Sequence, residues 1–184
     1  FYAGLNSFVL LSIPMFILMG MAVANSPAGK DLYTGLDRWL WRVPGGLVIS
    51  NIGACSIFAA LSGSSPATCA AIGTMGIPEM RKRGYSDQIA TGTIAAGGTL
   101  GVLIPPSIVL IVYGMATGTS IGRLFLAGIV PGFMLASLFA VWALIHSYFI
   151  DKNAAKLLRN RKPPTLREKF EVLPRIFPFL AIII

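Results

Sequence analysis

The sequence predicts an all-α membrane protein in which transmembrane helices accompany one re-entrant helical hairpin and one discontinuous helix. Mean hydropathy is +0.74, and only 12% of the 184 residues are charged, against about a quarter in globular domains. The charges are clustered, with none between Arg42 and Glu79. Prolines interrupt two long apolar stretches, at Ser65-Pro66 and at Pro105-Pro106. Each interruption predicts a break at membrane depth.

The first two elements are a membrane span and a surface helix. Residues 1–26 are interpreted as a transmembrane helix, because the apolar run from Gly4 to Ala24 meets the requirement of about 20 residues. Residues 27–44 are predicted to be a cytoplasmic interfacial amphipathic helix, since Ser26 can cap it and Pro27 suits its first position. Its apolar residues share one face. They are Leu32, Leu36, Trp39 and Leu40.

Residues 45–79 form the predicted re-entrant hairpin. The motif Ser62-Gly63-Ser64-Ser65-Pro66 breaks the apolar stretch into arms of roughly 17 and 12 residues, too short to span separately. Basic residues lie beyond both outer ends, so both ends face the cytoplasm under the positive-inside rule. Those after the hairpin are interpreted as topological anchors. They are Arg81, Lys82 and Arg83.

The remaining elements alternate between the two sides of the membrane. Residues 80–119 are predicted to be a cytoplasmic loop and a discontinuous transmembrane helix, and residues 120–150 a transmembrane helix. Residues 151–177 form a basic cytoplasmic connector, in which Thr165 and Glu168 have capping-box spacing for an amphipathic helix. Residues 178–184 begin a truncated transmembrane helix, so we expect a piece of a longer protein. Of the fifteen Lys and Arg residues, this topology places only Arg123 outside.

The proline pair removes hydrogen-bond donors from the predicted break. Pro105 and Pro106 have no N–H, so the carbonyls of Gly101 and Val102 lose their helical partners. Irregular backbone at membrane depth survives only where it is buried in protein or lines a polar cavity. A bound cation would satisfy these oxygens. The half-helix expected to start at Pro106 and Ser107 directs its N–H groups and positive dipole end toward an anion.

The hairpin tip offers similar chemistry. Ser65-Pro66 is interpreted as an N-cap with a first-turn proline, Ser62 and Ser64 supply hydroxyl oxygens, and Gly63 permits a tight bend. Two broken helices of this kind predict the ion and substrate site of a secondary transporter. Neither break contains Asp, Glu or His, so Na⁺ ligation by oxygen is favoured over a proton relay.

Three ordered motifs resemble the large membrane subunit of tripartite ATP-independent periplasmic (TRAP) transporters, and the resemblance runs over nearly the whole chain. They are FAALSGSSPATCAAIGTMGIPEMRKRGYS (58–86), GGTLGVLIPPSIVLIVYG (97–114) and SIGRLFLAGIVPG (120–132). The resemblance implies two inverted repeats that work as a Na⁺-driven elevator in the multi-pass inner membrane of a bacterial or archaeal cell. It implies as partners a small membrane (Q) subunit, a periplasmic substrate-binding protein and an organic acid anion such as a C4-dicarboxylate or sialic acid. Only the first repeat is present, so this chain is not expected to transport alone.

The same resemblance places one Na⁺ site between the hairpin tip and the break at 99–107. Together with the backbone chemistry it gives as expected Na⁺ ligands Ser62, Gly63, Ser64, Ser65, Thr99, Gly101, Val102 and Pro105. The expected substrate contacts, at the helix N-termini, are Ser65, Pro106 and Ser107. Gly97 and Gly101 also have GxxxG spacing, so helix packing is an alternative role for them.

Other ligands are not expected. The basic residues flank apolar segments and form no separate patch, so they indicate contact with membrane lipid and no nucleic acid. Cys55 and Cys69 lack CxxC or nearby His spacing and are interpreted as small buried residues. We expect no enzyme activity and no cofactor, with Na⁺ as the coupling ion.

Three alternatives compete with this hypothesis. A Na⁺/carboxylate symporter of the same architecture that needs no binding protein would carry the same pore motifs. An intramembrane serine hydrolase would use Ser64 as nucleophile and His146 as base, which requires the two to lie within hydrogen-bond reach. A purely structural membrane subunit would not depend on Ser64 or Pro106 for any response to Na⁺.

Overall fold

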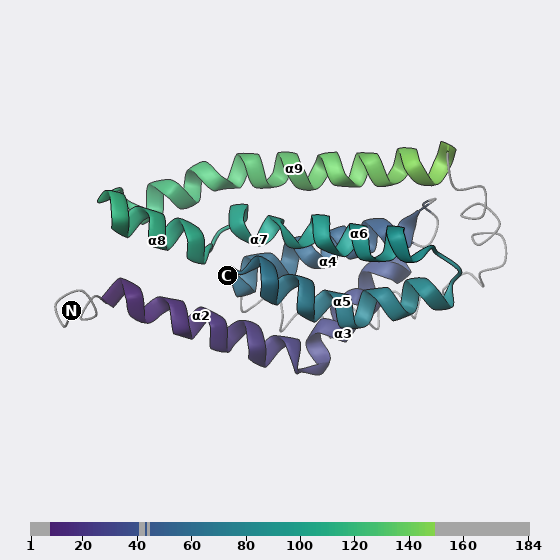
Figure 1. Cartoon of the computed structure of the whole chain (residues 1–184), viewed down its shortest axis with the longest axis horizontal. Helices are drawn as coiled ribbons and strands as arrows, with labels where there is room; N and C mark the ends of the chain where they lie inside the picture. The colour runs from purple at the N-terminus through teal and green to yellow at the C-terminus, as the bar shows by residue number, and fades with distance from the viewer. Residues whose placement is uncertain (1–7, 41–42, 44, 150–184) are drawn as a thin grey trace.

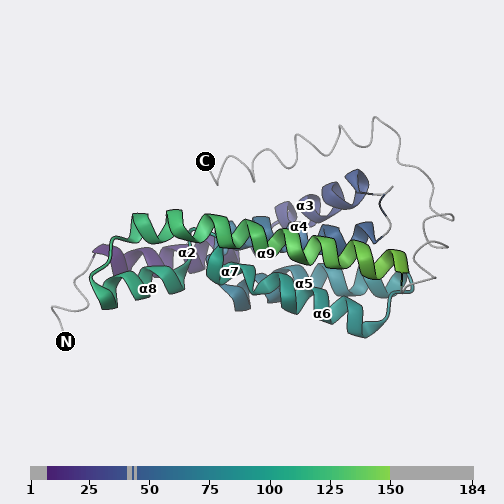
Figure 2. The ribbon, with the colours of Figure 1, turned by 90° about the horizontal axis from the view of Figure 1, so that it is seen from above.

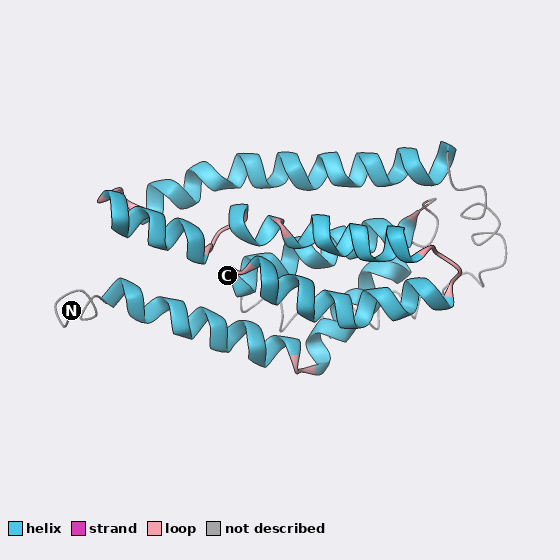
Figure 3. Ribbon diagram, in the orientation of Figure 1, coloured by secondary structure: helices cyan, strands magenta, loops and turns pink. Residues whose placement is uncertain are grey.

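Helices make up most of the chain in the computed structural model, which describes residues 8–40, 43 and 45–149 (Figure 3). The predicted connector at 151–177 and the helix start at 178–184 lie outside these residues, as do residues 1–7. In chain order the helices are α2 (Phe8–Ala24), α3 (Pro27–Trp39), α4 (Gly46–Ser62), α5 (Ser65–Lys82), α6 (Asp87–Gly98), α7 (Leu100–Leu103), α8 (Ile108–Thr117) and α9 (Ile121–Phe149).

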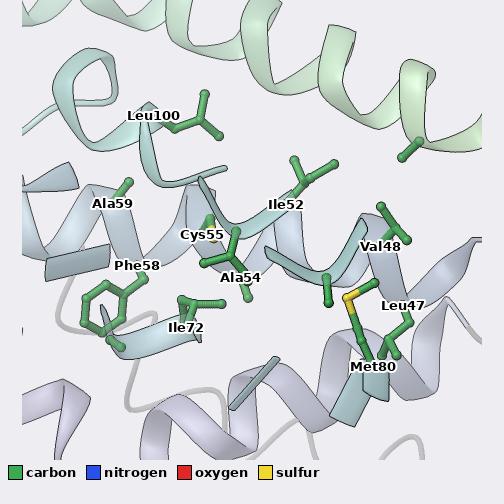
Figure 4. Close-up of a cluster of buried hydrophobic side chains, with 14 of the residues drawn as sticks. Leu47, Val48, Ile52, Ala54, Cys55, Phe58, Ala59, Ile72, Met80 and Leu100 are labelled. Atoms are coloured by element: carbon green, nitrogen blue, oxygen red, sulfur yellow. The ribbon is translucent and has the colours of Figure 1, made fainter. Parts of the chain in front are cut away.

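Helix α4 lies at the centre of the bundle because it is apolar on nearly every side. It packs against α2, α3, α5, α6, α7 and α9 (Figures 1 and 2). The close-up of the core shows α4 side chains meeting those of α5 and α7 (Figure 4). The labelled core residues, all buried, are Leu47, Val48, Ile52, Ala54, Cys55, Phe58, Ala59, Ile72, Met80 and Leu100.

The predicted hairpin is formed by α4 and α5, but its second arm is longer than expected. Helix α4 has 17 residues and α5 has 18, where the sequence suggested about 12 for the second arm. The predicted length was wrong because α5 begins at Ser65 and continues past Glu79 to Lys82. At 1.5 Å per residue, α4 is about 26 Å long, short of a hydrocarbon core of about 30 Å.

The predicted discontinuous helix consists of α6, α7 and α8. The apolar stretch Asp87–Thr117 is long enough to cross a membrane, and so is Ile121–His146 of α9. Helix α9 runs alongside α6, α7 and α8 (Figure 1). Its apolar side chains are largely exposed, as expected of a membrane protein. They include Leu126, Val130, Phe133, Met134 and Leu138.

The predicted amphipathic helix is confirmed as a helix in α3. It packs on α4, where the space beside Gly53 is filled by the side chain of Leu36. Residues 41, 42 and 44, at the end of the predicted element, lie outside the described part. Helix α3 therefore connects the first apolar helix to the start of the hairpin.

Candidate functional site

The hairpin tip is a two-residue turn between α4 and α5. Gly63 adopts a left-handed conformation with φ of 59°, and its N–H donates to the Ala59 carbonyl at 2.9 Å. Ser64 is extended, and its Oγ accepts from the amide of Ala67 at 3.5 Å. The sequence predicted Ser65 as the N-cap of α5. The N-cap is instead Ser64, one residue earlier, because Ser65 is already the first residue of the helix.

The break between α7 and α8 is an extended segment. Ile104 has φ of −76° and ψ of 120°, which confirms the extended geometry expected before a proline. Ser107 is also extended, and its Oγ accepts from the amide of Leu110 at 3.4 Å. Ser107 therefore caps α8, which begins at Ile108 and not at Pro106 as predicted. Both prolines lie in the connection, joined by a cis peptide bond.

The tip and the break are in direct contact. The amide of Ile108 donates to the carbonyl oxygen of Gly63 at 3.0 Å. A Cβ on Gly63 would lie 2.6 Å from the Pro106 oxygen, and one on Gly101 would lie 2.7 Å from the Ser65 nitrogen. Such distances leave no room for a side chain. Glycine at these two positions is thus required for the two breaks to meet.

Hydroxyl groups gather at the tip. Ser62 Oγ lies 3.0 Å from Thr68 Oγ1, which donates to the Ser64 carbonyl oxygen at 2.8 Å. The Oγ of Ser65 is buried and has no hydrogen-bond partner. A buried hydroxyl without a partner is destabilising unless a ligand or water completes it. Thr68 was missed in the sequence, although its position four residues after Ser64 places it one helical turn above the tip.

The structure brings most of the predicted site residues together, but not all. The tip and the break bring together Ser62, Gly63, Ser64, Ser65, Gly101, Pro106 and Ser107. Thr99 is exposed, and its hydroxyl donates to the Ala96 carbonyl oxygen at 2.6 Å. Val102 and Pro105 are half-buried on the break.

The other side of the break is apolar. A cavity of about 410 Å³ lies between α4, the break and α9, and Ile57, Ile104, Pro105 and Phe133 are among its lining residues. Polar ligands are therefore expected on the side of the break that faces the hairpin tip.

Gly97 and Gly101 have the close contacts that a packing role requires. A Cβ on Gly97 would lie 2.9 Å from the Cβ of Cys55, and Gly101 abuts Ser64 and Ser65. Cys55 is buried, as predicted, whereas Cys69 is only half-buried. The packing alternative for the two glycines is thus supported.

The possible metal ligands at the tip and the break are oxygen atoms that carry no formal charge. The breaks contain only hydroxyl and main-chain oxygens, and the described residues hold no group of three or more His, Cys, Asp or Glu side chains suited to a metal. Ca²⁺ and transition metals usually take carboxylate, imidazole or thiolate ligands. Neutral oxygens at the ends of broken helices suit a monovalent cation such as Na⁺.

His146 has a different environment from the tip. It lies in the last turn of α9 and its ring stacks near that of Trp142, with centroids 5.0 Å apart. The Ser64 hydroxyl is engaged in capping α5. These positions give no support to a Ser64–His146 hydrolytic pair, which needs direct hydrogen bonding.

Comparison with known proteins shows the family to which the chain belongs. The whole chain, residues 1–184, matches the family model described as tripartite ATP-independent periplasmic transporter, DctM component. It is 45% identical over 134 residues to the C4-dicarboxylate TRAP transporter large permease protein DctM of Pseudomonas aeruginosa, covering 73% of this chain and 31% of the relative. It is 33% identical over 174 residues to the sialic acid TRAP transporter large permease protein SiaM of Vibrio cholerae, covering 95% and 39%.

A third relative carries the name DctMQ. The isethionate TRAP transporter permease protein DctMQ of Oleidesulfovibrio alaskensis is 40% identical over 152 residues, which is 83% of this chain and 23% of the relative. The chain thus spans about a quarter to two fifths of the length of these three relatives. They are transporter permeases and not enzymes, which removes the hydrolase alternative. The chain belongs to the DctM family, the large permease component of TRAP transporters.

Proposed function

We propose that the chain is part of a Na⁺-coupled secondary transporter that imports an organic acid anion. The observation that supports this most directly is the buried Ser65 hydroxyl, which lacks a partner where the hairpin tip meets the break. The carbonyls of Gly101 and Val102 lie on the same short helix, and Pro105 and Pro106 cannot donate to them. Together these oxygens would replace the hydration shell of one Na⁺ ion.

The substrate carboxylate is proposed to bind close to this ion. Ser64 and Ser107 cap α5 and α8, so the N-termini of both helices lie at the contact between the tip and the break. The N–H groups and dipole of a helix N-terminus favour an anion. A cation bound beside them makes anion binding more favourable through Coulomb attraction. Each ligand then raises the affinity for the other, which is the thermodynamic basis of symport.

The architecture proposed for the complete protein is an elevator with two inverted repeats in the inner membrane. Helix α4 is shorter than a span, and basic residues flank both ends of the hairpin in the sequence, which supports a re-entrant hairpin entering from the cytoplasm. This chain would supply one hairpin and one discontinuous helix. The missing part of the protein would supply their counterparts and further substrate contacts.

The partners proposed are a small membrane (Q) subunit and a periplasmic substrate-binding protein. The relatives support these by name: several are TRAP transporter permeases, and one is called DctMQ. Their named substrates include C4-dicarboxylates, sialic acid and isethionate. All three are anions with oxygen acceptors, which fits a site formed by helix N-termini.

Reconstituted uptake tests this proposal. The full-length permease with its small subunit is placed in vesicles, and uptake of a labelled C4-dicarboxylate or sialic acid is measured with and without a Na⁺ gradient and the binding protein. Uptake is expected only when both are present. Uptake driven by Na⁺ without the binding protein would favour the independent symporter, and uptake that ignores Na⁺ would refute the coupling proposal.

A further inference from the structure

Arg83 forms an ion-pair cluster at the outer end of the hairpin. Its Nη1 lies 3.0 Å from Asp37 Oδ1, and its Nη2 lies 2.6 Å from Glu79 Oε1. Its Nε also donates to Glu79 Oε1, at 2.9 Å. The Asp37 side chain is 14% exposed and that of Arg83 is 25% exposed. The sequence suggested a topological anchor, and the structure adds that two carboxylates hold the guanidinium.

Neighbouring Arg81 provides a contrast. It pairs with Asp87 at 2.6 Å, but the two side chains are 56% and 67% exposed. An exposed pair of this kind contributes little to stability. The Arg83 cluster is more strongly desolvated, so breaking it has larger consequences.

The cluster joins two helices beside a cavity that both of them line. Asp37 belongs to α3 and Glu79 to α5, while Arg83 caps the end of α5. A cavity of about 390 Å³ lies between these helices, lined by residues that include Thr34, Asp37, Thr74 and Glu79. The ion pairs thus link α3 to the base of α5 beside this space.

The charges of the cluster depend on one another. Burial raises the pKa of Asp37, and the charge and hydrogen bond of Arg83 act in the opposite direction. Burial alone would lower the pKa of Arg83, but the ion pairs with Asp37 and Glu79 more than offset this and raise it. The fork of the guanidinium can contact both carboxylates at once, which a lysine ammonium reproduces poorly.

We infer that Arg83 is a positioning residue for transport, which ties α3 to the base of the α4–α5 hairpin so that the two move as one body. This inference rests on the proposed Na⁺-coupled function. The hairpin acts as a lever, because its tip is about 26 Å from its base at 1.5 Å per residue. A tilt of about 2° at the base then moves the tip by about 1 Å, enough to disturb an ion site.

The test is a charge exchange in the full-length reconstituted transporter. Arg83→Met removes the link and is expected to raise the Na⁺ concentration for half-maximal uptake about tenfold, within the range of coupling between contacting charges. For Arg83→Lys, this Na⁺ concentration is expected to lie between the values of Arg83→Met and wild type. The double variant Asp37→Arg with Arg83→Asp again places one guanidinium between two carboxylates and is expected to return near the wild-type value. Arg81→Met is the matched control and should match wild type.

The Na⁺ concentration for half-maximal uptake (half-saturation) distinguishes a positioning role of Arg83 from a purely structural role. A purely structural role would lower the amount of folded protein and the maximal rate while leaving half-saturation unchanged, and that result would overturn the inference. If Arg83→Met does not accumulate, Arg83→Lys decides: a raised half-saturation that the charge exchange returns to the wild-type value supports the tie, and a wild-type value in Arg83→Lys contradicts it. Na⁺-independent uptake by the wild type would instead refute the proposed function itself.

Discussion

The amide of Ile108 donates a hydrogen bond to the carbonyl oxygen of Gly63 at 3.0 Å. These residues are far apart in sequence, one at the hairpin tip and the other at the first turn of α8. Their bond uses an N–H that the helix cannot satisfy internally, since Ile108 is the first residue of α8. It fixes the distance between the two breaks.

Gly101→Ala is expected to destabilise the protein by separating α7 from the tip. The new Cβ would lie 2.7 Å from the Ser65 nitrogen and 2.8 Å from the Ser64 carbonyl carbon. Because these are backbone atoms, we expect a loss of about 1–3 kcal/mol of unfolding free energy. The measurement is the thermal unfolding midpoint of the full-length protein in detergent. Gly92→Ala is the control: nothing lies within 4 Å of its Cβ, so its midpoint should be equal or higher. Equal midpoints for both variants would contradict the close contact.

Ser65→Ala is expected to leave the fold intact in Na⁺-free buffer. Its buried Oγ has no hydrogen-bond partner, so its removal loses no protein hydrogen bond and avoids a desolvation penalty of about 1–3 kcal/mol. The unfolding midpoint in choline buffer should therefore be unchanged or higher. A clear fall would indicate that the hydroxyl has a structural partner. Ser64→Ala, which removes the α5 cap, should lower the midpoint by an amount equivalent to about 1 kcal/mol.

Replacing both Pro105 and Pro106 with alanine is expected to weaken Na⁺ binding. The restored N–H groups can pair with the carbonyls of Gly101 and Val102, which removes free acceptors from the break. We expect the Na⁺ half-saturation of uptake to rise by at least about tenfold, equivalent to about 1.4 kcal/mol. Pro131→Ala restores an N–H inside α9 and serves as the control. A double variant with wild-type Na⁺ dependence would exclude these carbonyls as ligands.

Na⁺ is expected to stabilise the full-length protein against heat. A ligand that binds only the folded state at about 100 times its dissociation constant adds about 2.7 kcal/mol. The unfolding midpoint should rise with NaCl, but not with KCl or choline chloride at equal ionic strength. Equal effects of the three salts would indicate general screening and no selective site.

Much of the helical pattern could be predicted from the sequence. The breaks at the tip and at Pro105-Pro106 follow from proline and glycine chemistry, which acts locally. The cap positions were less accurate, because both Ser64 and Ser65 can serve as an N-cap and only the backbone conformation selects Ser64. The second arm was underestimated because α5 begins at Ser65, within the predicted break, and continues past Glu79 into the basic run up to Lys82.

The remaining features depend on tertiary contacts that no local pattern contains. Thr99 lies next to the break in sequence, yet it faces outward on the helical surface. Thr68 lies inside a helix, yet it bonds to the tip. Arg83 sits in a basic run that suggests a topological anchor, and only the approach of Asp37 from α3 gives it a carboxylate partner from another helix. Long-range packing decides each of these placements.

A Na⁺ titration of uptake, comparing wild type with Ser65→Ala in the full-length reconstituted transporter, tests the central claim most directly. Ser56→Ala is the control, because that hydroxyl already donates to the Ile52 carbonyl at 2.8 Å. If Na⁺ binds where the hairpin tip meets the break, Ser65→Ala should raise half-saturation about tenfold while Ser56→Ala matches wild type. Identical Na⁺ curves for Ser65→Ala and wild type would contradict this account.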